Sequence, residues 1–328
     1  MRHALFAPFH LAGRIAPAAL LLLALAPAVH AEDAAQWLGR AAQAARQLSY
    51  VGTIVYQIGA RVETSRLAHL NDNGTELEKL VSLDGPAREV VRTPTDVRYY
   101  YPDVKMMKVE ARTFRNAFPS LSPDQQRSLS QYYDFRVVTG ERVGGRAAQV
   151  VSFEPRDGLR YGHRFWSDAA TGLLLKARVV NERGDVVEQF AFTDLNVNAK
   201  IDRALVEPSW PVTPPDWRVR EGTGGDVKPQ DTGWTVARVP PGFAKIMEGF
   251  RKVYGKPEPV AHLVYSDGLV AISVFVEPLP PAIANMGPSQ QGGLNGFSVK
   301  LDDHLVTALG EAPGATVRQI ANSVQARR

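Results

Sequence analysis

The feature that most constrains this chain is a series of short alternating segments between residues 50 and 196. The first of them, YVGTIVYQI (50–58), is rich in β-branched and aromatic residues, which favour strands. Turn signals separate the segments, and Asn73-Gly74 predicts a tight hairpin turn. About eleven strands fit into this interval, which predicts one large antiparallel sheet. Such a sheet can curl into a half-barrel with an apolar concave face.

Helical patterns flank and interrupt these strands. Residues 33–48 are rich in alanine, and their larger apolar residues recur at helical spacing: Trp37, Ala41, Ala44 and Leu48. We also predict a short helix over 111–118. A further helix is expected over 122–132, because Ser122 is a good N-cap and Pro123 suits the first helical position. We therefore expect the half-barrel to enclose helices.

The stretch from Trp166 to Leu195 contains two of the expected strands, joined by NERGD. Side chains alternate across a strand, so each strand should have one apolar face. These faces would carry Leu173, Leu175, Ala177 and Val179 in the first strand and Val186, Phe190 and Phe192 in the second. The sequence leaves open whether these side chains pack against the enclosed helices or leave room for an acyl chain.

The first 31 residues predict a secretory signal peptide. Arg2 and Arg14 give a positive start, and the apolar segment 15–29 is shorter than the ~20 residues of an ordinary membrane span. Cleavage is expected near Ala31. An uncleaved N-terminal anchor is the alternative. Since no other stretch of about 18 apolar residues exists, we expect an exported, soluble mature chain.

The remaining sequence predicts a half-barrel domain over 32–206, a linker over 207–233 and a second domain over 234–328. The linker is rich in Pro and Gly, and its Trp210 and Trp217 should pack against one domain.

The last domain is expected to be a small α+β unit with an antiparallel sheet. It should contain a strand from Trp234, two strands around Asp267-Gly268, a loop over 287–296 and two further strands. A C-terminal helix is expected over 313–325. An amphipathic helix after Pro240 should have one apolar face: Phe243, Ile246, Met247 and Phe250.

Composition excludes several classes of protein. The chain has no cysteine, which rules out disulfides and any cysteine-based metal or catalytic site. It has 38 basic and 34 acidic residues, and the signal peptide contains two of the basic ones. Nucleic acid is not an expected partner, because the chain is exported and has no dense run of Lys and Arg. An anionic lipid headgroup or acidic peptide remains compatible with this charge.

No catalytic or metal-binding signature is present. The sequence lacks the serine-hydrolase, zinc-protease, phosphate-loop and dinucleotide-binding patterns. The four histidines outside the signal peptide lie in separate strands or turns, and Asp302-Asp303-His304 is best explained as a turn between strands. We therefore expect no enzyme activity and no cofactor, although a site assembled from scattered Asp and Glu would not be visible.

Aromatic and methionine clusters are the candidate lipid-binding features. A tyrosine run at 99–101 and Met106-Met107 provide adaptable apolar surface. They are either ordinary core or the wall of a lipid cavity. The candidate lipid-binding residues are Tyr99, Tyr101, Met106, Leu173, Leu175, Phe190 and Phe192. Arg88, Arg92 and Arg98 are either solvated or a clamp for lipid phosphates.

With these predicted elements in this order, the chain resembles the RseB/MucB family of periplasmic regulators of the envelope-stress sigma factor. The resemblance rests on the first helix, on YVGTIVYQIGARVETSRLAHL, REVVR and FWSDAATGLLLKARVVNERGDVVEQFAFTDLNV, and in the last domain on PPGF, HLVYSDGLVAISVFVEP and GEAPGATVRQIANSV. It covers essentially the whole mature chain. The N-terminal half also resembles outer-membrane lipoprotein carriers, which lack the second domain.

The resemblance implies a negative regulator without enzyme activity. Family members bind the periplasmic region of a single-span anti-sigma factor, shield it from regulated proteolysis and are released by lipopolysaccharide or a related lipid. The candidate partner-binding residues here are Trp217, Phe243, Met247 and Phe250. Homo-oligomers are also compatible with the sequence. The alternatives are a periplasmic carrier of lipids or lipoproteins and an enzyme acting on envelope material.

Overall fold

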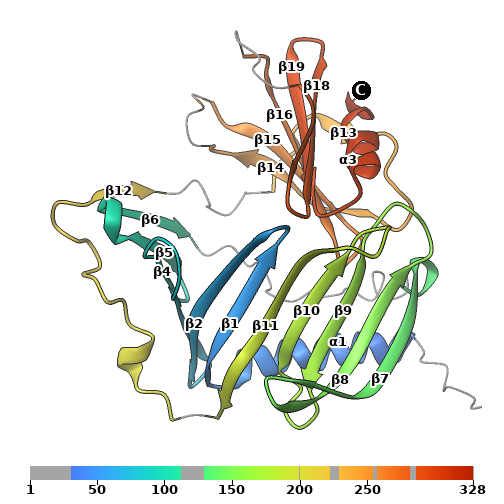
Figure 1. The fold of residues 1–328 in the computed structure, drawn as a ribbon. Helices are drawn as coiled ribbons and strands as arrows, with labels where there is room; N and C mark the ends of the chain where they lie inside the picture. The colour runs from blue at the N-terminus through green and yellow to red at the C-terminus, as the bar shows by residue number, and fades with distance from the viewer. Residues whose placement is uncertain are drawn as a thin grey trace, which may run out of the picture.

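The fold combines a large curved sheet with a smaller α+β unit (Figure 1). The computed structural model describes residues 31–111, 129–198, 200–221, 229–253, 256, 258–280 and 286–327. The large sheet has 12 strands in the order β12-β6-β5-β4-β3-β2-β1-β11-β10-β9-β8-β7. The first eleven in the chain are β1 (Tyr50–Ile58), β2 (Arg61–Asp72), β3 (Thr75–Ser82), β4 (Glu89–Arg92), β5 (Asp96–Tyr101), β6 (Met106–Ala111), β7 (Tyr133–Val143), β8 (Arg146–Pro155), β9 (Gly162–Asp168), β10 (Leu174–Val180) and β11 (Val186–Val197).

The predicted antiparallel half-barrel is confirmed. Every neighbouring pair among β1–β11 is antiparallel. The turn between β2 and β3 has positive φ at both Asn73 (51°) and Gly74 (90°). Two positive φ values define the tight turn that Asn-Gly favours, because Asn and Gly tolerate the left-handed region.

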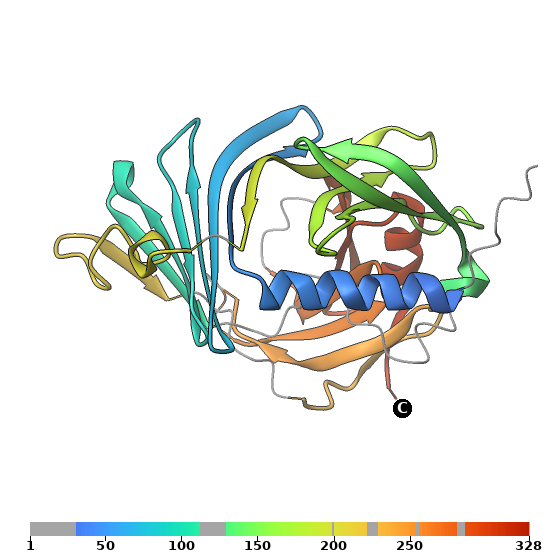
Figure 2. The same cartoon turned by 90° about the horizontal axis from the view of Figure 1, so that it is seen from below.

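Helix α1 (Ala31–Gln47) lies along the concave side of the sheet (Figure 2). Its buried residues Trp37, Leu38 and Ala41 pack against Phe153 and Phe165 of β8 and β9. Burying a side chain of the size of Leu38 or Phe153 stabilises the fold by about 1.5–3 kcal/mol. The helix expected over 33–48 is confirmed. The helix expected over 111–118 lies outside the described residues, and of the one over 122–132 the described residues 129–132 are helical.

The expectation that Leu173, Leu175, Ala177 and Val179 share one face is wrong. The pairing of β10 with β9 shifts between Leu174 and Lys176, which marks a β-bulge. A bulge inserts one extra residue, so side chains after it exchange faces relative to a simple alternation. Leu174 therefore packs towards α1 with Ala177, while Leu175 packs beside Trp166 on the opposite face.

The segment after β11 returns along the large sheet. It contains a short 3-10 turn, η2 (Arg203–Leu205), and then β12 (Arg218–Glu221), which pairs parallel with β6. Just before β12, Trp217 packs against Tyr100 and Met107. Trp217 also contacts Trp210, with ring centroids 5.2 Å apart. Part of the predicted linker is thus built into the edge of the sheet.

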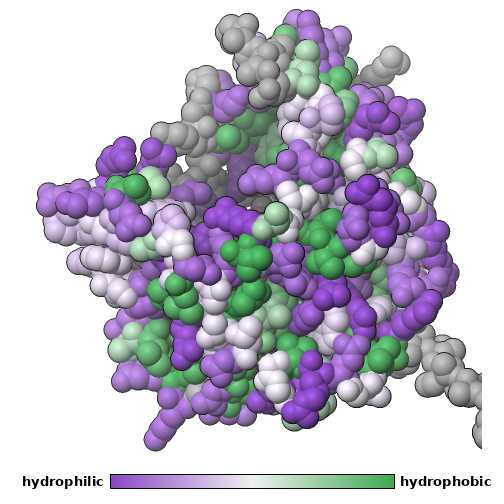
Figure 3. All heavy atoms as spheres, in the orientation of Figure 1, coloured by the Kyte–Doolittle hydropathy of each residue, from purple (hydrophilic) through white to green (hydrophobic). Residues whose placement is uncertain are grey.

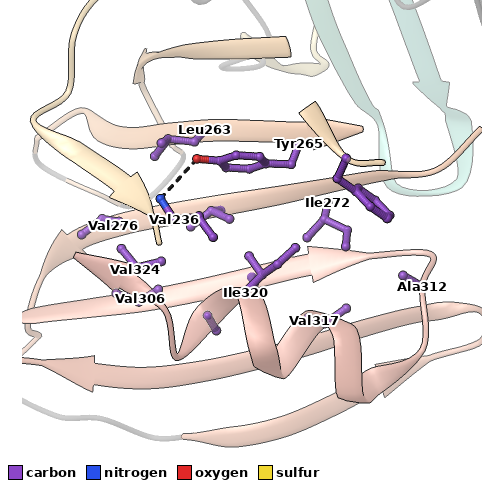
Figure 4. Packing of buried hydrophobic residues seen from close by; sticks show 14 of the residues in the cluster. Val236, Leu263, Tyr265, Ile272, Val276, Val306, Ala312, Val317, Ile320 and Val324 are labelled. Carbon is purple, nitrogen blue, oxygen red and sulfur yellow. Dashed lines mark hydrogen bonds between the residues drawn. The ribbon is translucent and has the colours of Figure 1, made fainter. Parts of the chain in front are cut away.

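The smaller unit has a six-stranded antiparallel sheet with one helix against it (Figure 4). Its order is β14 (Ala244–Arg251), β15 (Val260–Ser266), β16 (Ala271–Pro278), β19 (His304–Gly310), β18 (Leu294–Leu301) and β17 (Gly287–Gln291). Helix α3 (Gly314–Ala321) buries Val317 and Ile320 on this sheet. A two-stranded sheet of β13 (Trp234–Val236) and β20 (Val324–Ala326) closes the core, where Val236 N donates to Tyr265 Oη at 3.2 Å.

Three local predictions in this unit are wrong. The segment after Gly242 is strand β14 instead of an amphipathic helix, because it pairs with β15 at the sheet edge. The stretch 287–296 contains the β17–β18 hairpin instead of a loop. The C-terminal helix ends at Ala321, and the chain continues into β20. The strands around Asp267-Gly268 and the turn at Asp302-Asp303 are confirmed.

Candidate binding site

The cross-strand register shows which side chains share the concave face with α1. Side chains of paired residues point to the same face of a sheet. Phe190 of β11 packs towards α1, and its partner in β1 is Tyr56. Gly52 lies four positions before Tyr56 in β1 and therefore shares its face. From Gly52 the pairing runs across the sheet through the following residues: Leu67, Leu80, Val90, Tyr99 and Lys108. Tyr101, two positions after Tyr99, and its partner Met106 lie on the same face.

The part of the sheet formed by β7–β11 and β1, here termed the α1-packed part, is covered by α1 on its concave face. A hollow of about 330 Å³ remains beside the helix, lined among others by Ala44, Gln149 and Ser167. Leu173 and Phe192 are buried with Ala44 of α1 and Tyr50 of β1. Phe190 is half-buried and packs between this cluster and the one around Trp37. Leu175 lies on the other face of the sheet. These four predicted lipid-binding residues are therefore packed against protein side chains.

The part formed by β4–β6 and β12, here termed the distal part, presents the other three residues. Tyr99, Tyr101 and Met106 are half-buried on the concave face. The Tyr99 hydroxyl donates to Glu110 at 3.3 Å, and the Lys108 ammonium lies 5.5 Å from its ring centroid. Burial, followed by the Glu110 charge, raises the pKa of Tyr99 above its ordinary value. This surface combines aromatic area with charged neighbours.

The convex face of the distal part has its own small core. Val91, Tyr100 and Met107 are at most 2% exposed, and Trp217 covers them with its ring 6.3 Å from that of Tyr100. Aromatic contacts of this geometry add about 0.5–1.5 kcal/mol beyond burial. The linker therefore seals the convex side of the strands whose concave side carries Tyr99 and Met106.

The arginines considered as a phosphate clamp are paired with carboxylates. Arg88 donates to Glu63 at 2.7 Å, Arg92 to Glu78 at 2.7 Å and Arg98 to Asp96 at 2.8 Å. Each of these charges already has a partner, so the three arginines do not converge on one anion.

Arg160 joins the large sheet to the smaller unit. Its side chain is fully buried and donates to Asp267 at 3.1 Å and to the Pro241 carbonyl at 2.6 Å. Its guanidinium also lies 4.6 Å from the ring centroid of Tyr132 and 5.2 Å from that of Phe243. A buried cation needs this density of partners, because removing one partner of a buried pair costs about 3–5 kcal/mol.

Asp267 is the acceptor at this junction and lies in the turn between β15 and β16. It accepts from Tyr133 Oη at 2.9 Å and from the backbone amides of Leu269 and Val270. Burial raises the pKa of Asp267, and the backbone hydrogen bonds, with the Arg160 charge, oppose that increase. Burial also raises the pKa of Tyr133, which keeps its hydroxyl protonated as a donor.

Gly242 completes the junction. Its φ is +83°, and a Cβ at this position would lie 2.5 Å from the Tyr132 ring. Only glycine combines this backbone conformation with so close an approach. Further contacts across the junction run from Asn295 to the Tyr161 hydroxyl at 2.9 Å and from Thr316 to the Leu159 carbonyl at 2.9 Å.

The structure does not bring the predicted partner-binding residues together. Trp217 packs on the distal part, and Phe243 is buried beside Arg160. Met247 and Phe250 lie on opposite faces of β14, since they are three positions apart along a strand. Phe250 is 39% exposed.

Sequence reasoning missed Arg160 and Asp267. They are 107 residues apart, and Asp267-Gly268 gave only a turn signal. Arg160 falls within a segment predicted as a strand, where an arginine is most simply interpreted as solvated, so the sequence contained no signal for a buried pair.

The described residues contain neither a candidate membrane-spanning helix nor a candidate metal site. Neither α1 nor any other described helix combines the length and apolarity needed to cross a bilayer. Within the described ranges, no three His, Cys, Asp or Glu side chains are grouped so that they could hold a metal ion.

These features define a two-domain protein, in which a large curved antiparallel sheet is joined to a smaller α+β unit through Arg160 and Asp267. Residues 33–210 match the MucB/RseB N-terminal domain, and residues 228–325 match the MucB/RseB C-terminal domain. The chain therefore belongs to the MucB/RseB family.

Curated relatives are similar to this protein along most of its length. The sigma factor AlgU regulatory protein MucB of Pseudomonas aeruginosa is 35% identical over 91% of this chain and 93% of its own length. The sigma-E factor regulatory protein RseB of Escherichia coli K12 is 27% identical over 86% of this chain and 87% of its own. A crystal structure of MucB in complex with MucA(peri) superposes with a TM-score of 0.69 at 32% identity, covering 90% of this chain and all of that one.

Proposed function

We propose that this protein is a periplasmic negative regulator of an envelope-stress sigma factor, and that it acts by binding the periplasmic region of a single-span anti-sigma factor. The observation that carries the proposal is its similarity, over 90% of the chain, to MucB in its complex with MucA(peri). The predicted signal peptide supports export to the periplasm.

In this proposal the bound regulator shields the anti-sigma factor from proteolysis, and lipopolysaccharide or another acyl-chain lipid releases it. The lipid would lie against the concave face of the distal part, next to Tyr99, Tyr101 and Met106. Half-buried tyrosines and a methionine suit this role, because they offer apolar area that adapts to varied shapes.

The pairing of β6 with β12 offers a physical route from the lipid to the rest of the molecule. Met106 is in register with Arg218, the first residue of β12. A lipid that displaces Met106 would act on β12, which precedes the smaller domain in the sequence. By linkage, a lipid that prefers the free regulator must weaken the partner complex by the same coupling free energy.

The partner test is capture from membranes. Immobilised mature protein, incubated with detergent-solubilised inner membranes, is expected to retain a single-span anti-sigma factor. Capture of many unrelated lipoproteins without such a regulator would favour a periplasmic carrier instead.

The lipid test uses the captured complex. Lipid A is expected to release the partner from the wild type, and the double variant Tyr101→Ser/Met106→Ser should respond less. The matched control is Val62→Ser/Leu83→Ser, which alters two exposed apolar residues, each at least 55% exposed, and should respond like the wild type. Equal release from both variants would contradict the assignment of the lipid to the distal part.

A further inference from the structure

A cluster of positive charge surrounds Trp166 on the face of the large sheet opposite α1. Phe165 points towards α1, where it stacks on Trp37, so its neighbour Trp166 points to the other face. The Trp166 ring lies 4.7 Å from the Lys176 ammonium, 4.9 Å from the Arg164 guanidinium and 5.5 Å from that of Arg178. Figure 3 views the molecule from this side, where hydrophilic and hydrophobic residues are interspersed.

Strand register fixes this grouping. Arg164 pairs with Arg178, and Trp166 pairs with Lys176, so the four side chains occupy the corners of one patch on β9 and β10. The indole of Trp166 is 3% exposed, and its Nε1 donates to Glu141 at 2.6 Å. The buried, hydrogen-bonded Trp166 ring therefore has a fixed position, and the three cations lie around it.

The positive charge in this patch is only partly compensated. Glu141 pairs with Arg164. In the described part of the chain, neither Lys176 nor Arg178 forms an ion pair, and Arg178 donates to the neutral amide of Gln189 at 3.2 Å. Burial, and then the nearby Arg178 charge, lower the pKa of Lys176, and the Glu141 charge opposes this decrease. Two positive charges thus remain side by side, and an anion bound there would relieve their repulsion.

A hollow of about 430 Å³ adjoins the two arginines. Ser152, Arg164 and Arg178 line it in one cross-strand row, and Gly162, Val180 and Asn181 line it beyond that row. Of the carboxylates in its wall, Glu154 pairs with Arg136 and Asp157 with Arg160, while Glu182 lies exposed. The volume is in the range of small-molecule sites, with Arg164 and Arg178 at one end of the hollow and charged and neutral side chains mixed in the rest of its wall.

We propose that this patch and hollow bind a phosphate monoester of sugar size, with the phosphate against Arg178, Lys176 and Arg164. A phosphate monoester carries about −1.5 to −2 charges at neutral pH, which matches the two uncompensated cations. Arginine provides a planar donor pair for phosphate oxygens, and lysine adds a point charge. A carboxylate would neutralise only one of the two. The site lies on the opposite face from the proposed lipid surface, so it does not rest on the proposed function.

The test is calorimetric titration of the mature protein with glucose 6-phosphate, inorganic phosphate and glucose at equal ionic strength. The wild type is expected to bind the phosphorylated sugar and not glucose. Lys176→Gln/Arg178→Gln should weaken binding by about tenfold or more, since charge-assisted hydrogen bonds are lost. Lys176→Arg keeps the charge and should bind within about threefold of the wild type.

The matched control is Arg66→Gln/Lys300→Gln, which removes two exposed cations outside the patch. It should change the affinity by less than about twofold, because screened distant charges contribute little. Unchanged melting temperatures would show that all variants are folded. Equal weakening in both double variants would overturn the proposal, and so would absence of wild-type binding both in this titration and in the vesicle assay described next.

A second arm identifies the source of the phosphate. Phosphatidylcholine vesicles with and without phosphatidic acid are sedimented with the same variants. Binding that requires phosphatidic acid and is lost in Lys176→Gln/Arg178→Gln supports a lipid headgroup. Binding of the soluble ester alone supports a free phosphate ester. Failure in both arms contradicts the site.

Discussion

In the α1-packed part of the large sheet the most deeply buried rings lie on the concave face, whereas in the distal part the most deeply buried ring lies on the convex face. Phe153 and Tyr133 are inaccessible to solvent beneath α1. In the distal part, Tyr100 is equally buried but points the other way, towards Trp217 of the linker. One continuous sheet thus uses its two faces differently along its width.

The difference separates two roles for similar residues. A ring that α1 covers contributes mainly to the stability of the fold. A ring on the concave face of the distal part, such as Tyr99, is half-buried among ion pairs and contributes less to the core. The concave face of the distal part is therefore the better candidate for a ligand surface. Substitutions in the two parts should differ in how much they lower the free energy of unfolding.

The largest effect is expected from Phe153→Ala in the α1-packed part. Truncating a fully buried phenylalanine should lower the free energy of unfolding by about 4 kcal/mol, because it removes burial and leaves a cavity. Tyr99→Ala in the distal part should cost about 1 kcal/mol or less. Chemical denaturation of both variants checks this. Equal losses would remove the distinction between the two parts.

The next effect is a pH dependence confined to the α1-packed part. His163 is buried and stacked on Phe165, and burial lowers its pKa to about 4 from 6.5. A depressed pKa means that its contribution is fully present above pH 6.5 and declines as the pH falls towards 4. The wild type should therefore lose about 2 kcal/mol from this residue between pH 8 and pH 5.

Unfolding experiments on His163→Leu at several pH values isolate this contribution. Other groups titrate in both proteins, so the difference between the two curves belongs to His163. The curves should converge as the pH falls from 8 to 5. Parallel curves would show that protonation of His163 carries no cost.

The smallest effect distinguishes two tryptophans. Trp37 Nε1 donates to the buried hydroxyl of Ser167 at 3.0 Å, so Trp37→Phe should cost about 1 kcal/mol beyond any loss of packing. Trp217 packs as a ring on Tyr100, and Trp217→Phe should keep most of that contact. Thermal unfolding of the two variants measures the difference. A larger loss at Trp217 would mean that the linker, and not α1, anchors the sheet more firmly.

Local patterns were sufficient for much of the fold. The alternation of apolar and polar residues predicted the strands of the large sheet, and helical spacing around Trp37 predicted α1. Asn73-Gly74 predicted a hairpin turn. In each case a single segment contains the information, because the period of a strand or helix is a local property.

Features that depend on distant partners were not predictable in this way. The segment Ala244–Arg251 has helical spacing but forms an edge strand on β15, and pairing overrides weak local preferences. The bulge at Leu174 moved Leu175 to the other face. The pair Arg160–Asp267 depends on the docking of two units, which no local window contains.

Gly242 has a consequence for how the two domains can evolve. Two independent conditions exclude other residues there, the positive φ and the approach to the Tyr132 ring. A smaller residue at position 132 would relieve the second condition but not the first. No single substitution at position 242 is therefore expected to be neutral. The residue at position 132 is in turn restricted by a residue 110 positions later in the chain. Insertions or domain exchanges in this lineage should preserve both sides of the contact together.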